Sequence, residues 1–360
     1  MLTSKPRLPL KEILLIGLLP SPIKKLIYRL KGYRIGRNVS LGFGCVITGK
    51  EVEIGEGTTI GFLTIIRGRT VRIGRHVQIG ATTFLDTPHL EIGEGSRINE
   101  QVFVGGLQFP DSQFIMGRNC QIMQMSFINP ARSIKMGDDS GIGGYSLLFG
   151  HASWLSKFEG YPVDFGEIEI GQSVSISWRV FILPGSKIGD GTIVGANSLV
   201  RGTIPDHCLA VGYPARVVSK PPEFPSPVSD EEKIRYLHEI TAEMVEYFRG
   251  FDLGCSQVAG DWVVCQEIRG WLGSRTRQWT IRILSSAGET LVNELTRSPV
   301  DVVVSLFAIP PEMREKLNSA RCVWLDIGSK ERSDCGSEIG EEVAMYLRRY
   351  GVRFLRQKPA

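Results

Sequence analysis

The chain has 360 residues, of which 42% are hydrophobic and 22% are charged, and its formal net charge is +4. This hydrophobic fraction excludes a disordered chain, and a charge so close to neutral over this length gives no indication of nucleic acid as a partner. The 41 glycines exceed the usual share but lack the strict three-residue period of collagen.

The first 31 residues form an apolar segment with basic side chains. Residues 8–31 predict a helical cap, residues 1–31 in all, that covers the start of the next domain. The alternative is peripheral contact of residues 8–31 with the inner face of a membrane. The apolar run 13–19 is too short to span a bilayer, and no cleavage site of a signal peptide follows it, so we expect a cytoplasmic protein.

The seven cysteines form no C-x-x-C pair. We therefore expect neither a redox dithiol nor a metal knuckle, and no metal cofactor. A reducing cytosol is the compartment that this cysteine usage favours.

From residue 35 onward, aliphatic residues return every six positions. Three such hexads make one coil, and we count about eight coils. The first hexads of the coils begin at Ile35, Ile54, Ile73, Ile92, Met116, Met136, Ile170 and Ile188. Four residues after the aliphatic position, the first two hexads of each coil carry only small or β-branched residues, as at Thr58 and Ser96.

A period of six cannot be an α-helix, whose apolar face recurs every 3.6 residues. Short strands on the three faces of a prism fit it, with the aliphatic and small residues inside and glycine at the corners. Residues 32–219 contain 30 of the 41 glycines, in agreement with this interpretation. We predict a β-solenoid over residues 32–218, with successive coils paired as parallel strands.

Two interruptions break the hexad register. The spacing between Val104 and Met116 is widened by a short loop, and the spacing between Leu148 and Ile170 by a longer one. Because a solenoid gains no stability from a long loop, we expect the longer interruption to serve function, the alternative being an insertion without a function.

A different composition follows the solenoid. Residues 219–229 hold four prolines and predict a linker, and Ser229 with Glu232 predicts a capping box. Residues 230–360 predict a small α/β domain of unknown role. Its expected strands are 262–265, 279–284, 300–306, 322–326 and 352–355, and its expected helices are 311–317 and 339–349.

The end of the solenoid carries a family resemblance. The segments that carry it are Ile182-Leu183-Pro184-Gly185, Ile188-Gly189-Asp190-Gly191, Gly195-Ala196-Asn197-Ser198 and residues 211–218. Together with a loop that bears a histidine, they resemble the hexapeptide-repeat acyltransferases, in the branch of sugar and polysaccharide O-acetyltransferases. The resemblance implies a left-handed parallel β-helix.

The resemblance also implies a catalytic histidine where the chain leaves the prism, and His151 occupies that position. A neutral histidine suits the role of general base that activates a sugar hydroxyl. Relatives carry a histidine or an aspartate shortly afterwards, where this chain has Ala152 and Ser153. Asp164, Glu159 or a backbone carbonyl is then the group that orients His151.

A coenzyme A site along the late coils is the next implication. The matching positions hold Ser177, Trp178, Ala196, Arg201, Gly202 and Arg216. Arg201 would meet the nucleotide phosphates in place of the lysine that relatives carry one residue later. Trp178 would stack on the ligand or pack between protomers, and Arg216 would bind the ligand or cap the solenoid.

The expected function is transfer of an acetyl group from acetyl-CoA, as co-substrate, to a hydroxyl of a sugar or polysaccharide precursor. The resemblance implies a homotrimer with its sites at the interfaces. One alternative is a γ-type carbonic anhydrase, although His76, His89, His151 and His207 lack the close spacing of that family. The other is a non-catalytic scaffold whose C-terminal domain binds a partner.

Overall fold

The computed structural model describes residues 8–270 and 273–357. The remaining residues of the expected cap (1–7) and of the C-terminal domain (271–272 and 358–360) lie outside the described part. The chain divides into two compact units, Met1–Ser226 and Pro227–Ala360. Each unit is described by itself.

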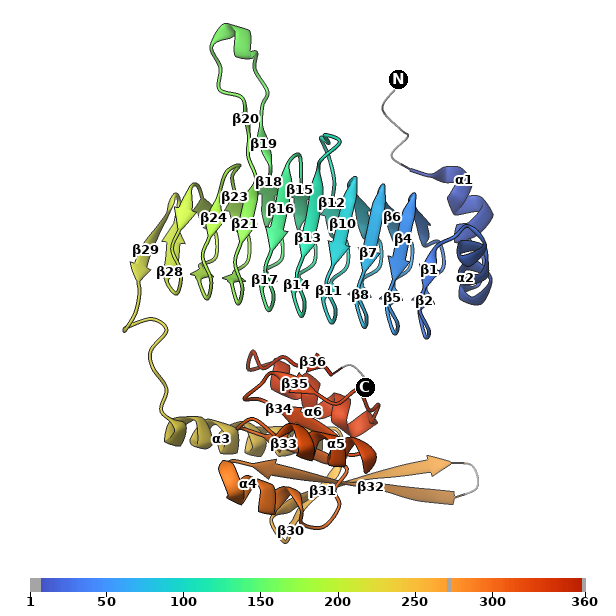
Figure 1. Cartoon of the computed structure of the whole chain (residues 1–360), viewed down its shortest axis with the longest axis vertical. Coiled ribbons are helices and arrows are strands. Elements are labelled where there is room, and N and C mark those ends of the chain that lie inside the picture. The colour runs from blue at the N-terminus through green and yellow to red at the C-terminus, as the bar shows by residue number, and fades with distance from the viewer. Residues whose placement is uncertain (1–7, 271–272, 358–360) are drawn as a thin grey trace. The chain divides into compact units, whose positions relative to one another are not determined.

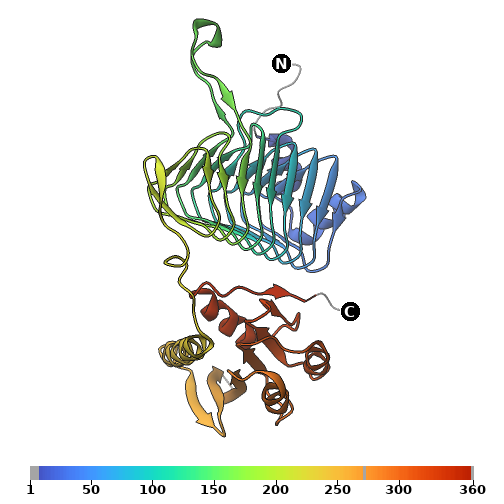
Figure 2. The ribbon, with the colours of Figure 1, turned by 60° about the vertical axis from the view of Figure 1, so that its left-hand side comes forward.

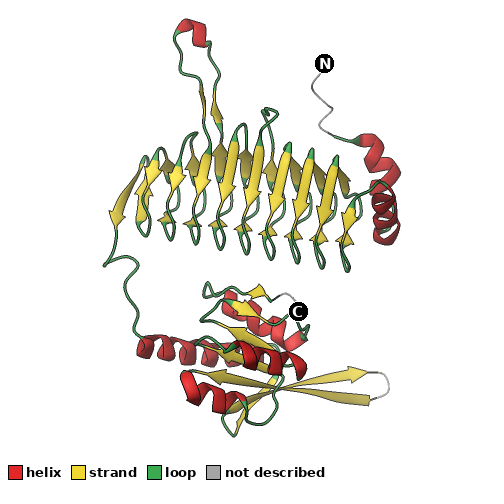
Figure 3. Ribbon diagram, viewed as in Figure 1, coloured by secondary structure: helices red, strands yellow, loops and turns green. Residues whose placement is uncertain are grey.

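The first unit is built of three sheets that the chain visits in turn, one short strand at a time (Figures 1 and 3). The first sheet has nine parallel strands: β1 (Arg34–Ile35), β4 (Glu51–Ile54), β7 (Thr70–Ile73), β10 (His89–Ile92), β13 (Gln113–Met116), β16 (Ser133–Met136), β21 (Ile168–Ile170), β24 (Lys187–Ile188) and β27 (Thr203–Ile204).

The other two sheets repeat this arrangement. The second comprises β2 (Ser40–Leu41), β5 (Thr59–Ile60), β8 (Gln78–Ile79), β11 (Arg97–Ile98), β14 (Gln121–Ile122), β17 (Gly141–Ile142), β22 (Ser175–Ile176), β25 (Ile193–Val194), β28 (Leu209–Gly212) and β29 (Ala215–Ser219), the last pair antiparallel. The third comprises β3 (Val46–Thr48), β6 (Ile65–Arg67), β9 (Phe84–Asp86), β12 (Phe103–Val104), β15 (Phe127–Asn129), β18 (Leu147–Phe149), β23 (Phe181–Ile182) and β26 (Leu199–Val200).

The strand register is the one that the hexads predict. Ile92 pairs with Met116 across the first interruption, and Met136 pairs with Ile170 across the second. These side chains are buried in one continuous core that runs along the inside of the three sheets. The six-residue period therefore marks the inward positions, because a residue on the wrong face of a strand would leave this core.

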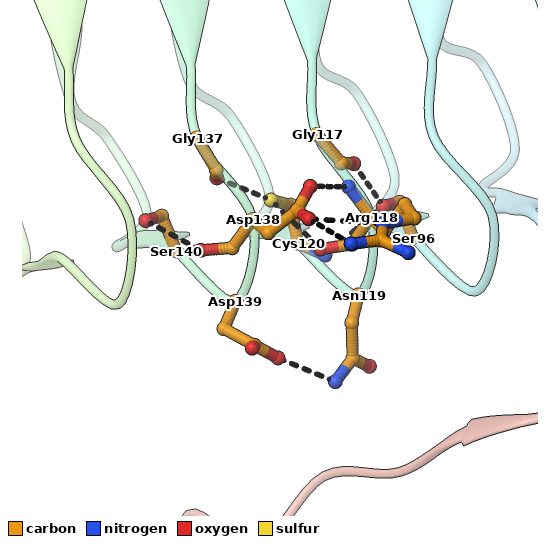
Figure 4. A network of polar contacts seen from close by, with 9 residues as sticks. All are labelled: Ser96, Gly117, Arg118, Asn119, Cys120, Gly137, Asp138, Asp139 and Ser140. Carbon is orange, nitrogen blue, oxygen red and sulfur yellow. Dashed lines mark hydrogen bonds and ion pairs between the residues drawn. The ribbon is translucent and has the colours of Figure 1, made fainter. Parts of the chain in front are cut away.

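Hydrogen bonds between coils explain the small residues of the pattern. At the corner between the first and second sheets, the Ser96 hydroxyl donates to the Gly117 carbonyl at 2.7 Å and the Ser140 hydroxyl donates to the Gly171 carbonyl at 2.8 Å. The Cys120 thiol donates to the Gly137 carbonyl in the same way (Figure 4). On the outer surface of the same corner, Arg118 forms an ion pair with Asp138 at 2.6 Å. The small interior residue thus satisfies a buried carbonyl of the next coil.

Helices lie at the N-terminal end of the β-helix (Figure 2). The expected helical segment is divided into α1 (Leu10–Glu12), a π-helical turn (Ile13–Gly17) and α2 (Ser21–Leu30). The interruption falls at Pro20, which has φ −60° and ψ 148° at the N-cap of α2.

In its described residues, the second unit contains one sheet of seven strands and four helices. Its elements are α3 (Asp230–Arg249), β30 (Gly254–Val258), β31 (Asp261–Gly270), β32 (Gly273–Leu284), α4 (Gly288–Leu295), β33 (Val302–Ser305), α5 (Pro311–Ser319), β34 (Val323–Asp326), β35 (Glu331–Arg332), α6 (Glu338–Arg348) and β36 (Leu355–Arg356). The sheet order is β30-β31-β32-β33-β34-β35-β36, with β32, β33 and β34 parallel.

The predicted capping box is confirmed, because Ser229 Oγ accepts from the Glu232 amide and Glu232 accepts from the Ser229 amide. The prediction of a strand over 352–355 was wrong in its bounds, since β36 is Leu355–Arg356. Helix α4 was missed because its residues show no extended apolar run in the sequence. Such short elements are specified by their packing on the sheet rather than by local periodicity.

Candidate functional site

The longer interruption forms an arm that leaves the β-helix between the third and first sheets (Figure 1). It consists of β19 (His151–Ala152), a 3-10 turn (Lys157–Glu159) and β20 (Asp164–Phe165), and β19 pairs antiparallel with β20. At its base the Gly150 amide donates to the Asn129 carbonyl at 2.9 Å, and the Gly166 amide donates to the Gly150 carbonyl at 3.1 Å. The arm therefore emerges from a fixed base.

The His151 ring lies among aromatic rings at this base. Its centroid is 6.2 Å from that of Phe149 and 6.2 Å from that of Phe165, with which it is nearly parallel. Phe109, from the shorter interruption, meets Phe165 edge-on at 5.4 Å, and the Arg132 guanidinium lies 4.1 Å from the centre of the Phe109 ring. The two loops that break the hexad register thus meet beside His151.

Burial sets the protonation state of His151. Desolvation lowers the pKa of His151 below its ordinary value of 6.5, so the ring is neutral at pH 7. Nδ1 is buried and has no hydrogen-bond partner among the described residues, which leaves Nε2 as the nitrogen that can meet a ligand. A neutral imidazole with an available nitrogen can accept a proton.

The register of the arm separates Asp164 from His151. Asp164 is opposite Ala152, whereas His151 is opposite Phe165. Because directly opposed residues share a face and neighbours alternate, Asp164 points to the other face of the ribbon. Glu159 lies in the exposed turn at the far end of the arm. Within the described chain, neither these side chains nor a backbone carbonyl accepts a hydrogen bond from Nδ1.

Asn129 is a site residue that the sequence did not single out. It precedes Phe149 by one coil and pairs with it in register. Only 4% of Asn129 is exposed, and its Oδ1 has no hydrogen-bond partner among the described residues. A Cβ on Gly106 would lie 2.5 Å from the amide nitrogen, so glycine makes room for this side chain. A buried amide oxygen without a hydrogen-bond partner among the described residues, on the strand that pairs with the Phe149 strand, is a candidate to bind a polar ligand.

The residues expected to bind coenzyme A lie along two corners. Ser177, Trp178 and Ala196 lie between the second and third sheets in successive coils, where 41% of Trp178 is exposed. Trp178 lies 6.2 Å from the Tyr145 ring. Arg201 and Gly202 lie between the third and first sheets, the side from which the arm leaves two coils earlier.

Arg216 is exposed on β29, in the hairpin that ends the β-helix. Because this hairpin follows the last coil, Arg216 belongs to neither of the two corners.

The histidines of the β-helix do not converge. His89 is on the first sheet, His76 and His207 are in turns between the first and second sheets, and His151 is on the arm. Among residues 8–270 and 273–357, no group of three or more His, Cys, Asp or Glu side chains is arranged to hold a metal ion.

Curated proteins with similar sequences are described as acetyltransferases. The "Putative lipopolysaccharide biosynthesis O-acetyl transferase WbbJ" of Escherichia coli K12 is 33% identical over 114 residues, covering 28% of this chain and 58% of that protein. The "Probable acetyltransferase Rv3034c" of Mycobacterium tuberculosis is 32% identical over 144 residues, covering 36% of this chain and 43% of that protein. The matches thus span less than two thirds of these relatives. They confirm the resemblance to acetyltransferases predicted from the sequence.

No protein-family model matches the chain. Similar solved structures include AntD, an N-acyltransferase of Bacillus cereus in complex with dTDP and coenzyme A, at a TM-score of 0.33 and 16% identity, covering 55% of this chain and 88% of that one. A galactoside acetyltransferase in complex with coenzyme A has a TM-score of 0.24 and 21% identity, covering 40% of this chain and 66% of that one.

Proposed function

We propose that the chain transfers an acetyl group from acetyl-CoA to a hydroxyl of a sugar or polysaccharide precursor, with His151 as general base. The observation that carries the proposal is the neutral His151 ring at the junction of the two loops that interrupt the β-helix. The similarity to proteins described as acetyltransferases supports the reaction class.

In this reaction His151 Nε2 removes the proton of the acceptor hydroxyl as its oxygen attacks the thioester carbonyl. The carbon–sulfur bond then breaks, and the departing thiolate of coenzyme A receives this proton from the imidazolium. Backbone N–H groups stabilise the oxyanion in between. The buried amide of Asn129 positions the acceptor hydroxyl, because its hydrogen-bonding capacity is unused within the described chain.

Acetyl-CoA is proposed to bind along the late coils. Ser177, Trp178 and Ala196 would contact its pantetheine arm, and Arg201 beside Gly202 would meet its phosphates. Arg216 would extend this contact at the end of the β-helix. The exposure of Trp178, Arg201 and Arg216 leaves these side chains free to meet a ligand.

The active unit is proposed to be a homotrimer of left-handed β-helices of about eight coils. Support comes from the outer face of the third sheet, where Phe84, Phe103 and Phe127 form a stack with centroids 5.1 and 4.9 Å apart. Leu147, Phe181 and Leu199 continue the same row. A neighbouring β-helix would cover this half-buried apolar row beside His151. A stable monomer in solution would contradict a site shared between protomers.

The test of the proposal is thiol release from acetyl-CoA with candidate sugar acceptors. We expect H151A to lower kcat at least 100-fold, whereas H89A, which removes a histidine from the first sheet, retains wild-type turnover. D164A is expected to retain more turnover than H151A, since the register places this carboxylate away from the His151 ring. Undiminished turnover in H151A would contradict the assignment.

A further inference from the structure

One side of the N-terminal helices packs against the first coil of the β-helix. Tyr28 and Lys24 are buried, the Tyr28 hydroxyl accepts from the Ile47 amide at 2.9 Å, and Lys24 Nζ donates to the Gly42 carbonyl at 2.6 Å. Ser21 Oγ accepts from the Leu41 amide at 3.0 Å. These side chains form hydrogen bonds with backbone groups of the first coil that lie at the edge of its sheets and have no preceding strand to pair with. The inner side of α2 is therefore explained by the fold.

The other side of the same helices is apolar and exposed. We call it the leucine surface, and it consists of Leu8, Leu10, Leu14, Leu15, Leu18, Ile23, Leu26 and Leu30. The exposed fractions reach 72% at Leu15 and 80% at Leu30. Single exposed leucines are common, but eight large aliphatic side chains within one short segment are not. The packing of the cap on the first coil does not need them.

Basic side chains accompany the leucine surface. Residues 8–31 contain Lys11, Lys24, Lys25, Arg29 and Lys31 and a single acidic residue, Glu12. Lys25 Nζ donates to the Val39 carbonyl at 2.9 Å and Arg29 donates to the Ile35 carbonyl at 3.0 Å, so these two side chains are held against the first coil. Lys11 and Lys31 are exposed. An apolar face with excess positive charge is complementary to anionic phospholipid headgroups over an acyl layer.

We propose that the leucine surface docks the chain on a membrane that contains anionic phospholipid, without crossing it. None of the helices in the described residues is long and apolar enough to span a bilayer. The leucines enter the boundary between headgroups and acyl chains, and Lys11 and Lys31 contact the headgroups. This inference does not depend on the proposed transferase activity.

The test is flotation of the full-length protein with vesicles of phosphatidylcholine alone or mixed with phosphatidylglycerol. We expect the wild type to float with the mixed vesicles. L14S/L15S should lower the partition coefficient at least tenfold, because the hydroxyl replaces apolar surface that would leave water. K11Q/K31Q should lower it about fivefold per lysine on mixed vesicles and leave weak binding to phosphatidylcholine unchanged.

M345S is the matched control, because Met345 is 52% exposed in the second unit, and it should float like the wild type. Unchanged melting temperatures show that the variants are folded, since Leu14 and Leu15 make no part of the core. The proposal is overturned if the wild type stays with the unbound fraction or if L14S/L15S floats equally well. A concentration-dependent mass that L14S/L15S abolishes, without vesicle binding, would identify a second copy as the occupant instead.

Discussion

At the residue scale, the neutral state of His151 follows from aromatic neighbours rather than from a charge. Phe149 and Phe165 remove water from the ring, and this desolvation lowers the pKa of His151. A general base needs the neutral form, so burial favours the active protonation state at pH 7. An unpartnered Nδ1 means that the ring's orientation is set by packing within this chain.

A pH dependence of turnover follows from this desolvation. We expect kcat/KM for the acceptor to be level near neutral pH and to fall on acidification with a midpoint below 6.5. Because the pKa of His151 is lower in the folded chain than in the unfolded chain, the unfolded chain binds the proton more readily on acidification. Protonation of His151 therefore lowers the free energy of unfolding as the pH falls below 6.5. A pH–rate profile of thiol release measures the midpoint, and a midpoint above 7 would contradict a desolvated base.

Two asparagines of similar burial allow function to be separated from stability. Both asparagines have a buried Oδ1 without a hydrogen-bond partner among the described residues, but Asn129 pairs in register with Phe149, whereas Asn119 Nδ2 donates to Asp139 at 2.7 Å (Figure 4). N129A is expected to lower turnover about 100-fold while changing the free energy of unfolding by less than about 1 kcal/mol. N119A should lose about 1–2 kcal/mol and keep its turnover. Thiol-release assays and chemical denaturation of both variants check this, and equal activity loss in both would remove Asn129 from the site.

At the element scale, the sequence of each coil is restricted at two kinds of position: those whose side chains point into the core and those at the corners. The inward positions, such as Ile92 and Met116, could be predicted from the sequence because a slip of one residue would expose the entire row. Asn129 could not, because the last residue of β15 lies outside the aliphatic repeat, so the hexads do not predict which side chain it carries. The strand β31 was predicted only over 262–265, since the residues that follow, apart from Ile268 and Gly270, are polar and show no continuous apolar run.

Corner glycines are required by the spacing of the coils as well as by their dihedral angles. A Cβ on Gly93 would lie 2.4 Å from the Gly117 carbonyl carbon of the next coil. Gly185 has a φ of +73° but no atom within 4 Å of an added Cβ. We expect G93A to lower the free energy of unfolding by more than 3 kcal/mol and G185A by about 1 kcal/mol. Denaturant unfolding followed by circular dichroism compares them, and equal losses would contradict a steric requirement for glycine at position 93.

At the scale of the whole molecule, the two units have separate cores. The core of the first runs inside the three sheets, and the second unit has two clusters of its own on the faces of its sheet. The hexads predict the inward positions of the coils, because a repeat reports each of these positions many times over. The second unit has no repeat, so its sequence indicates the class of its fold but leaves elements such as α4 undetermined.

Charged groups buried in the second unit provide the means to perturb it alone. Arg282 of β32 donates to both carboxylate oxygens of Asp261 in β31, at 2.8 and 2.6 Å, and the two residues are 2% and 7% exposed. Arg282 also donates to the Glu294 carbonyl at 3.1 Å and thereby fixes the end of α4 on the sheet. Removing Asp261 leaves a buried guanidinium without its counter-charge.

We therefore expect D261A to destabilise the second unit by about 3–5 kcal/mol and to leave the β-helix unaffected. Hydrogen-exchange mass spectrometry of the full chain should show faster exchange over residues 227–357 and unchanged protection of the coils. R277A is the control, since it removes an exposed ion pair with Glu338 and should change stability by less than about 1 kcal/mol. Faster exchange in the coils of D261A would show that the units unfold together. If D261A keeps its thiol release with a small sugar acceptor, the second unit has no role in the chemical step. Its role would then be the recognition of a larger acceptor or of a partner.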